Sequence, residues 1–381
     1  MGGESTTMSA AMSAATDRIR VSYRLKCQSG DDPHERALDI AFEQTVELPE
    51  QCVPSRIRDS VVGRVEDVTQ ADGDAWTATI SYPSHTVAGD FGQLLNMLFG
   101  NISLKSGVQV TDLELPGSYD SQLPGPHFGV AGLRQLCGVP DGVPLSCAAL
   151  KPLGLSGAEL AQVCYQFALG GIDIVKDDHS LADQASAPFR ERVVLCQEAI
   201  ERANRATGGS SLYFPNVPSR WSTFEDDVST AISAGAAGIL VSPLVIGIDA
   251  VRCTAEQGSV ALLGHPALAG AFFQPDHGIV PDLLLGKLFR LAGCDGVIYP
   301  NVGGRFTLSE SQCVAINSRL REPLGRIKPA FAVPAGGIDV TRIPYWLDRY
   351  GPDTIFLVGS SLYSRGDLTV ASRTLMKSLG R

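Results

Sequence analysis

A repeated alternation of short apolar segments and helical segments limits the folds open to this 381-residue chain more than any other feature. Eight times after residue 144, an apolar run is followed by a stretch with helical periodicity. Eight βα units in about 240 residues are typical of a (β/α)8 barrel, whereas a doubly wound sheet would need fewer units or a switch in strand order. The predicted strands are 145–150, 172–176, 211–215, 238–242, 260–263, 296–299, 330–333 and 354–358.

The region before the barrel has a different pattern. Strands are predicted at 19–25, 58–68, 76–82 and 108–116, a helix at 90–99, and either state at 37–46. Strands with few helices and no βα rhythm indicate a small α+β domain. A stretch rich in Pro, Gly and Ser at 118–127 is typical of a linker. We therefore predict a disordered tail over 1–17, an α+β domain over 18–125 and the barrel domain over 126–381.

Composition excludes several classes of protein. The chain is 44% hydrophobic and 19% charged, which is ordinary for a globular protein with an ample core. A net charge of −10 argues against a nucleic-acid binder, and no apolar run approaches the ~20 residues of a membrane span. The nine cysteines contain no CxxC pair, so they indicate free thiols in a reducing cytoplasm and not a disulfide framework.

Four ionisable residues end the second predicted strand of the barrel, in the sequence GGIDIVKDDH at 170–179. Because side chains alternate along a strand, Lys176 and Asp178 are expected on one face, and His179 follows where the strand becomes a loop. Two interpretations stay open. One is an internal salt bridge. The other is a metal site in which Asp178 and His179 supply donors and Lys176 does so after carbamylation by CO2, since a protonated lysine cannot bind a cation.

The chemistry of a (β/α)8 barrel lies at the C-terminal ends of its strands. Those ends carry Lys151 after the first strand, His265 after the fifth and Arg305 after the sixth. Glycines follow the last two strands, where barrels expose backbone N–H groups to a phosphate, namely Gly336-Gly337 and Gly359-Ser360. Each signal alone has a plainer explanation, a core histidine or an ordinary turn. Their shared position predicts an enzyme that binds one phosphate, with lysines and, on the second interpretation above, a divalent metal.

These motifs resemble those of the large subunit of ribulose-1,5-bisphosphate carboxylase/oxygenase (RuBisCO), and more closely the RuBisCO-like proteins, from about Ile19 onward. GGIDIVKDDH is similar to the family's Gly-Gly-x-Asp-x-x-Lys-x-Asp-Glu metal motif, and KPLGLS at 151–156 to its strand-one lysine motif. The resemblance implies a ferredoxin-like α+β domain followed by a (β/α)8 barrel. It also implies that Lys176 is carbamylated and binds Mg²⁺ with Asp178 and His179, and that Lys151 transfers protons.

The resemblance further implies a homodimer with the active site at the subunit interface. In the family, the first domain of one chain caps the barrel of the other. Gly100-Asn101 matches the asparagine that meets substrate and metal across that interface, and Glu43 matches an active-site glutamate of the same domain.

Departures from the family's pattern indicate a different reaction. His179 stands where the family has a glutamate ligand, which makes Mn²⁺ an alternative to Mg²⁺. Arg305 replaces the mobile-loop lysine of carboxylation, and arginine holds its proton too tightly to transfer it. Contacts to one of the two phosphates have become Pro266, Ile298 and Ala335. The resemblance thus implies no CO2 fixation and a substrate with one phosphate and an uncharged far end.

The chemistry that remains is metal-assisted enolisation, with Lys151 or the Lys176 carbamate as base and His265 as a second proton carrier or a hydroxyl partner. The first hypothesis is an isomerase of a phosphorylated ketose such as 5-methylthioribulose 1-phosphate. The second is a decarboxylase or transcarboxylase of a branched β-keto sugar-acid phosphate (the 3-oxo-isoapionate 4-phosphate type), whose carboxylate Arg305 would bind. The third is a non-catalytic scaffold, against which the retained metal and proton-transfer residues argue.

Overall fold

The computed structural model describes residues 17–120, 122–306 and 308–381, so the predicted disordered tail lies, apart from Asp17, outside the described residues. The chain divides into two compact units. Unit 1 comprises the described residues up to Leu123 together with Ala269–Leu284, and unit 2 comprises Pro124–Leu268 and Leu285–Arg381. Within the described ranges, no helix has both the length and the apolar character needed to cross a membrane.

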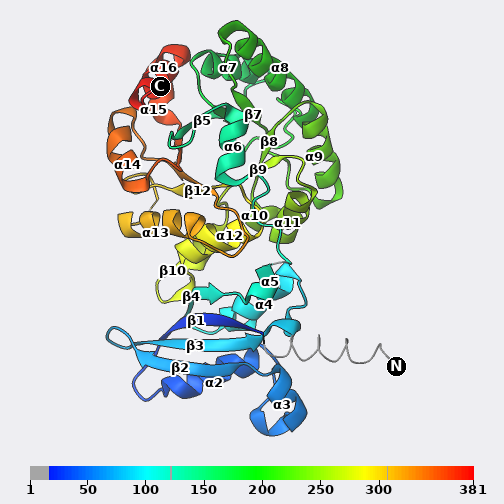
Figure 1. Ribbon diagram of the computed structural model, residues 1–381, viewed down its shortest axis with the longest axis vertical. Coiled ribbons are helices and arrows are strands. Elements are labelled where there is room, and N and C mark those ends of the chain that lie inside the picture. The colour runs from blue at the N-terminus through cyan, green and yellow to red at the C-terminus, as the bar shows by residue number, and fades with distance from the viewer. Residues whose placement is uncertain (1–16, 121, 307) are drawn as a thin grey trace. The chain divides into compact units, whose positions relative to one another are not determined.

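Unit 2 is the predicted (β/α)8 barrel (Figure 1). Its strands are β5 (Leu145–Leu150), β6 (Ile174–Asp177), β7 (Leu212–Phe214), β8 (Gly238–Val241), β9 (Ala261–Gly264), β12 (Gly296–Pro300), β13 (Phe331–Ala335) and β14 (Ile355–Val358). They lie in the order β7-β6-β5-β14-β13-β12-β9-β8. Backbone hydrogen bonds from Leu240 N to Pro215 O (2.8 Å) and from Val217 N to Leu240 O (3.1 Å) join β8 to the end of β7 and close the ring.

Two long helices of the barrel begin at serine residues that cap them. Ser156 and Ser309 each form a capping box, with Glu159 and Gln312 respectively, so the sequence itself marks these helix starts. Before the sixth barrel strand the chain forms a π-helix at Asp282–Leu288, followed by a short α-helix. The α-helices are α6 (Gly129–Cys137), α7 (Gly157–Leu169), α8 (Phe189–Thr207), α9 (Phe224–Ser233), α10 (Pro243–Ile246), α11 (Ile248–Gln257), α12 (Phe289–Leu291), α13 (Glu310–Arg321), α14 (Ile343–Tyr350), α15 (Ser360–Tyr363) and α16 (Leu368–Ser378).

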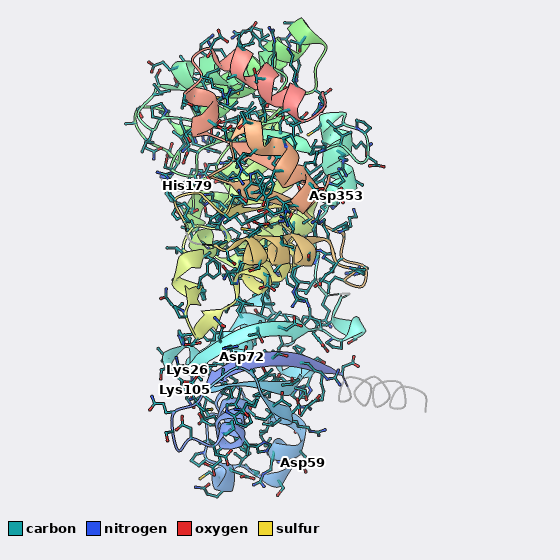
Figure 2. All side chains as sticks on the ribbon, turned by 90° about the vertical axis from the view of Figure 1, so that its left-hand side faces the viewer. Lys26, Asp59, Asp72, Lys105, His179 and Asp353 are labelled. Atoms are coloured by element: carbon teal, nitrogen blue, oxygen red, sulfur yellow. The ribbon has the colours of Figure 1, made fainter. Side chains whose placement is uncertain are left out.

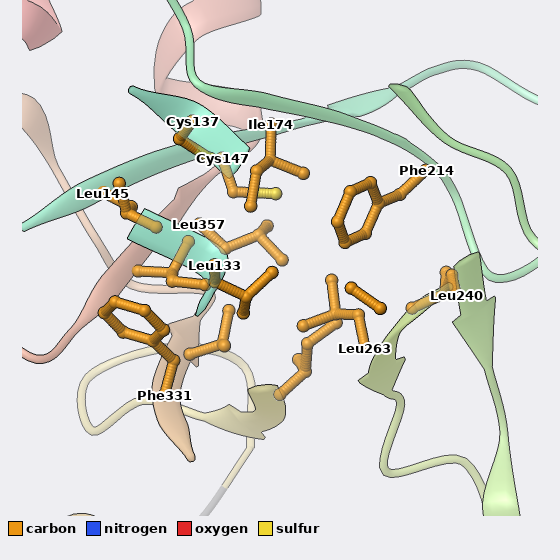
Figure 3. Close-up of a cluster of buried hydrophobic side chains, with 14 of the residues drawn as sticks. Leu133, Cys137, Leu145, Cys147, Ile174, Phe214, Leu240, Leu263, Phe331 and Leu357 are labelled. Carbon is orange, nitrogen blue, oxygen red and sulfur yellow. The ribbon is translucent and has the colours of Figure 1, made fainter. Parts of the chain in front are cut away.

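Alternate residues of the strands point inward and fill the barrel, because successive side chains on a strand face opposite ways. Figure 3 shows Ile174, Phe214 and Leu263 converging from three different strands. Ile298 belongs to the same cluster and is 3% exposed, and Ala335 packs against it. Since the interior is packed with apolar side chains, the polar residues that follow the strands are left at the C-terminal mouth of the barrel.

A buried carboxylate beside the N-terminal end of β12 joins three segments of the barrel. Asp295 is fully buried and accepts hydrogen bonds from the backbone N–H groups of Phe128 (2.7 Å), Gly129 (2.7 Å) and Leu262 (2.8 Å). Burial raises the pKa of Asp295 from 3.8 to about 6, although these hydrogen bonds oppose the rise. Between about pH 4 and pH 6 the folded protein therefore holds a proton that the unfolded chain has released.

We predict that Asp295 makes the free energy of unfolding fall by up to about 3 kcal/mol as the pH rises from about 4 to about 6. Chemical denaturation of wild-type and Asp295→Asn proteins at several pH values checks this. The stability of the wild type minus that of the variant should decline across this window and stay level above it. The exposed Asp348, changed to Asn, is the control. A difference that does not vary with pH would contradict the raised pKa.

Unit 1 has a sheet of its own, in the order β10-β11-β4-β1-β3-β2. Its elements are β1 (Arg18–Lys26), α2 (Pro33–Glu43), α3 (Ser55–Val61), β2 (Arg64–Gln70), β3 (Ala75–Pro83), α4 (Phe91–Phe99), β4 (Val108–Glu114), α5 (Gly117–Asp120), β10 (Phe273–Gln274) and β11 (His277–Ile279). The first four strands with α2 and α4 follow the β-α-β-β-α-β order of ferredoxin-like folds. The predicted strand over 19–25 is confirmed as part of β1, and its alternate residues Ile19, Val21, Tyr23 and Leu25 are completely buried.

The predicted strand over 58–68 is wrong in its first half. Helix α3 extends to Val61, and β2 begins at Arg64. Pro54 precedes the helix, and Gly63 lies at the break, where a Cβ atom would be 2.8 Å from the Tyr82 ring. The spacing of apolar residues over 58–68 fits a helix and a strand equally well, so the boundary was not visible in the pattern.

The structure also corrects the predicted extent of the barrel domain, 126–381. The segment 269–284 packs with unit 1, where β11 pairs in parallel with β4 through Gly278 opposite Gln109. A salt bridge of 2.8 Å between Lys26 and Asp276 also joins the segment to this unit. Strands of two and three residues carry no measurable period, so the sequence did not indicate this pairing.

Candidate active site

The C-terminal ends of the barrel strands carry the predicted lysines, carboxylate and imidazoles. Lys151 directly follows β5, and Lys176 lies within β6, where the parallel register sets it opposite Ala149. Asp178 is the first residue after β6, and His265 the first after β9. The strands of the barrel therefore bring to one end residues that lie more than 100 positions apart in the sequence.

Asp178 is the shared partner of the charged groups at this end. It is 5% exposed, and both of its carboxylate oxygens have contacts. The Lys151 ammonium contacts Oδ2, while Nδ1 of His179 lies 2.9 Å from Oδ1. Ser180 also donates to Oδ1 from its backbone N and its Oγ, each at 3.2 Å. Asp178 therefore forms a salt bridge with Lys151 and not, as the first interpretation had it, with the lysine of its own strand, and the contact shows that this buried carboxylate attracts a cation.

Lys176 is buried, and its Nζ donates to the backbone carbonyl of Asp177 at 2.9 Å. Burial, aided by the neighbouring charge of Lys151, lowers the pKa of Lys176 to about 8, against the opposing effects of Cys147 and Asp177. A lysine reacts with CO2 through its neutral amine. Lys176 has more of this form near neutral pH than an ordinary lysine.

The two histidines at this end stack on each other, with ring centroids 4.1 Å apart and planes 10° apart. Burial lowers the pKa of both, for His265 to about 2, so both rings are neutral. His265 Nδ1 accepts a hydrogen bond from Ala267 N (3.2 Å), which leaves the proton on Nε2. His179 has the opposite tautomer, because its Nδ1–H faces Asp178 and its Nε2 keeps a lone pair.

The residues at the end of β6 suit a divalent cation. Within the described ranges, no three His, Cys, Asp or Glu side chains lie close enough together to hold a metal ion. Asp178 and His179 are two such donors, and Lys176 would become a third only as a carbamate. That set of two oxygen donors and one imidazole nitrogen suits Mg²⁺ or, because of the imidazole, Mn²⁺.

A fully buried ion pair, which no sequence pattern indicated, lies next to this site. The Arg192 guanidinium in α8 donates to Asp177 Oδ2 at 3.0 Å, and both side chains are 0% exposed. Tyr213 donates to the other oxygen of Asp177 at 2.8 Å. Arg192 also donates to the backbone carbonyls of Ala187 (2.7 Å) and Ala182 (2.8 Å). The pair thus connects β6, the loop after it and α8.

Asn216, at the end of the third barrel strand, fixes the loop that carries the candidate metal ligands. Its backbone N donates to Asp177 Oδ2 at 3.0 Å. Its side-chain amide donates to the carbonyls of Leu181 (2.8 Å) and His179 (3.2 Å). An asparagine just after a buried strand was the sequence signal for this role, whereas Arg192 is one of four arginines in α8 and no pattern set it apart from the others.

The glycine-rich loops after β12 and β13 are in backbone contact. A Cβ atom at Gly337, which has a φ of +70°, would lie 2.6 Å from Gly304 N, so neither loop admits a side chain there. Arg305 is exposed in the first of these loops. Burial and the charge of Arg305 lower the pKa of Lys151, an effect that the contact with Asp178 opposes. The loop after β12 therefore carries a positive charge within electrostatic reach of the β5 end.

A second cluster, in unit 1, contains the other two predicted residues. Asn101 Nδ2 donates to Glu43 Oε1 at 3.1 Å. Lys105, which the sequence analysis did not single out, lies 3.5 Å from the other oxygen of Glu43. Gln44 holds the turn before Asn101 by donating to Met97 O (2.7 Å) and accepting from the backbone N that follows Asn101 (3.2 Å). Figure 2 labels Lys105 in this unit and His179 in the barrel.

Comparison with known families shows to which family the chain belongs. The family model described as "Ribulose bisphosphate carboxylase large chain, catalytic domain" matches residues 130–371. The chain belongs to the ribulose bisphosphate carboxylase large-chain family. The matched residues include every candidate residue of the barrel, from Lys151 to Ser360.

Relatives within this family extend the likeness over nearly the whole chain. The 5-methylthioribulose-1-phosphate isomerase of Rhodospirillum rubrum is 38% identical over 354 residues, which cover 92% of this chain and 93% of that protein. The 2,3-diketo-5-methylthiopentyl-1-phosphate enolase of Geobacillus kaustophilus is 33% identical over 294 residues, 76% of this chain and 70% of that protein. The crystal structure of a RuBisCO-like protein from Rhodopseudomonas palustris, 36% identical, superposes with a TM-score of 0.87 over 96% of this chain and 98% of that one.

Proposed function

We propose that this protein is an enzyme that enolises and isomerises a monophosphorylated keto sugar of the 5-methylthioribulose 1-phosphate type, without fixing CO2. The observation that carries the proposal is the near full-length similarity to the isomerase of Rhodospirillum rubrum. The mouth of the barrel supports it, because lysines of lowered pKa lie beside a carboxylate and two neutral imidazoles.

The metal in this proposal is Mg²⁺, or Mn²⁺ because of the imidazole, held by Asp178, His179 and a carbamate formed from CO2 on Lys176. When bound, the cation would act as a Lewis acid that polarises the carbonyl and the neighbouring hydroxyl of the substrate. The neutral tautomer of His179, with a lone pair on Nε2, suits this role.

The side chains around the metal ligands move the protons. Lys151, with its pKa lowered by burial and by Arg305, takes the proton at Nζ from the carbon next to the carbonyl, as the carbamate of Lys176 also could. His265 cannot serve as an ordinary base, because its pKa of about 2 keeps it from accepting a proton near neutrality. Its Nε2–H instead donates a hydrogen bond to a substrate oxygen, the hydroxyl-partner role of the two that the sequence left open.

The two ends of the substrate meet different surroundings. The backbone N–H groups of the glycine loops at Gly336-Gly337 and Gly359-Ser360, with Arg305, bind the single phosphate. On the other side, Ile298 is buried in the apolar barrel core and Ala335 packs against it, so neither offers a hydrogen bond to a second phosphate. An uncharged tail such as a methylthio group suits that side.

Proton exchange tests the proposal. The protein is mixed with Mg²⁺, bicarbonate and a panel of monophosphorylated ketoses and β-keto acids in D2O, and NMR follows deuterium incorporation and products. Deuterium at the carbon next to the carbonyl, followed by an isomerised product from 5-methylthioribulose 1-phosphate, is the expected result. No exchange with any substrate, together with no metal binding by calorimetry, would leave only the non-catalytic scaffold.

A second candidate function follows from one residue. Arg305 puts an exposed guanidinium in a mouth loop, and guanidinium binds carboxylates bidentately. This favours a decarboxylase or transcarboxylase of a β-keto sugar-acid phosphate of the 3-oxo-isoapionate 4-phosphate type. Release of labelled CO2 from such an acid, without isomerisation of the ketose, would replace the first proposal with this one.

The proposed assembly is a homodimer in which Glu43 and Asn101 of one chain complete the barrel mouth of the other. Complementarity of charge supports it. The surface cavity of about 430 Å³ beside Glu43 is lined by four further acidic residues and by Leu38 and Leu48, while the barrel exposes two arginine–aromatic pairs, Arg220-Trp221 and Arg305-Phe306. Acidic rims around apolar side chains attract such pairs.

Mixed dimers test this assembly. Lys176→Ala and Asn101→Ala subunits, each inactive alone, are co-expressed with different tags. If each site uses both chains, half of the dimers are mixed and each has one intact site, so about a quarter of wild-type activity returns. Sites built within a single chain would recover none.

A further inference from the structure

Three successive loops at the mouth of the barrel are joined to one another. The glycine backbones of the loops after β12 and β13 touch at Gly304 and Gly337. The loop after β13 is then joined to the segment after β14 by a single side chain, Asp339, two residues beyond Gly337. These are the loops to which the proposed function assigns the phosphate.

Asp339 makes contacts in both of the segments it connects. Its Oδ1 accepts from the backbone N of Thr341 at 2.8 Å and from the Thr341 hydroxyl at 2.6 Å. Its Oδ2 accepts from the hydroxyl of Ser361 in α15 at 3.1 Å, and Arg365 lies 3.7 Å from Oδ1. One carboxylate thus caps the short helix after the Gly336-Gly337 loop and also holds the first turn after Gly359.

We propose that Asp339 is a positioning residue that holds the Gly336-Gly337 loop and the Gly359-Ser360 turn at a fixed separation, so that both present backbone N–H groups to one phosphate. The proposal rests on the proposed function for the identity of the ligand. A pre-arranged anion site binds more tightly because less loop entropy is lost on binding.

If Asp339 only capped a helix, its removal would affect stability but not the affinity for phosphate. Asp367 also caps a helix, α16, by accepting one hydrogen bond from Val370 N at 2.9 Å, and within the described part of the chain its side chain makes no hydrogen bond or ion pair with a glycine loop. Removal of either carboxylate removes a helix cap, which affects stability in a similar way. Only removal of Asp339 also separates the two glycine loops. Asp367→Ala is therefore a matched control for Asp339→Ala.

Calorimetry with inorganic phosphate, on the full-length protein, tests the proposal directly. Asp339→Ala should weaken phosphate binding about five- to tenfold, and Asp367→Ala should not change it. Asp339→Asn, which can still hydrogen-bond to Thr341 and Ser361, should largely restore the affinity. Ser361→Ala should weaken binding as Asp339→Ala does, and the double variant should be no worse than either, since both remove the same connection.

Kinetics with the phosphorylated substrate provides the second measurement. Because the phosphate lies away from the reacting carbon, Asp339→Ala should raise KM by a similar factor and change kcat far less. Unchanged phosphate affinity in Asp339→Ala, with binding intact in the wild type, would overturn this inference and leave the proposed function standing. A wild-type protein that does not bind phosphate would overturn both.

Discussion

Replacing Lys176 with alanine should abolish metal-dependent proton exchange and lower turnover at least about 1,000-fold. The side chain is 3% exposed, and its pKa of about 8 gives it more of the neutral amine, the form that CO2 would modify, than an ordinary lysine has. Without it, only Asp178 and His179 remain of the proposed metal ligands, and two protein ligands hold a divalent cation poorly. The measurements are deuterium incorporation by NMR and calorimetric titration of Mg²⁺ and Mn²⁺, with and without bicarbonate.

Two further variants distinguish a carbamate from a structural charge. Lys176→Arg keeps the positive charge but cannot form the carbamate, so it should be as inactive as Lys176→Ala. Lys287 is the other lysine that is buried among the described residues, and Lys287→Ala should keep metal binding and exchange. If Lys176→Arg retained proton exchange and bicarbonate did not change metal binding or exchange in the wild type, no carbamate would form. The charged residues at the end of β6 would then serve only as internal salt bridges.

Removing the Arg192 guanidinium should lower the free energy of unfolding by about 3–5 kcal/mol. The substitution Arg192→Met keeps most of the aliphatic volume but leaves the fully buried carboxylate of Asp177 without its cation. Burial already raises the pKa of Asp177 against the opposing effect of Arg192, so the pKa should rise further in the variant. The stability deficit should consequently shrink as the pH is lowered and Asp177 takes up a proton.

Denaturation curves at several pH values check this expectation, with Arg205→Met as the control. Arg205 lies on the same helix, but its side chain is 72% exposed, and its pair with Glu201 is worth little at that exposure. The double variant Asp177→Asn/Arg192→Met should recover part of the loss, because no charge is then left buried. A deficit below about 1 kcal/mol that does not vary with pH would show that the pair does not stabilise the β6 end.

The barrel was predictable because its signal is local and repeated. Each strand is a short apolar run, and capping residues such as Ser156 and Ser309 mark where helices begin. The segment 269–284 was not predictable, since its strands are two and three residues long, and β11 joins it to β4, which lies more than 150 residues earlier. Pairing at that separation depends on the geometry of the whole chain, and no local period records it.

The candidate site also has a part that the sequence predicts and a part that it does not. Lys151, Lys176, Asp178 and His265 could be named from the sequence, because the ends of parallel strands meet at one end of a barrel. Their protonation states could not. Burial lowers the pKa values of His265 and Lys176, and that burial depends on neighbours that are distant in sequence.

The sequence by itself determined the barrel, the small sheet domain before it, the family and the chemical types at the strand ends, because hydrophobic period and motif spacing are properties of neighbouring residues. Only the tertiary structure decided that Arg192 neutralises Asp177, that Asp178 lies between Lys151 and His179, and that Asp339 joins two glycine loops. Charge and hydrogen-bond energies depend on distance and burial, and these are set only when segments far apart in the chain pack together.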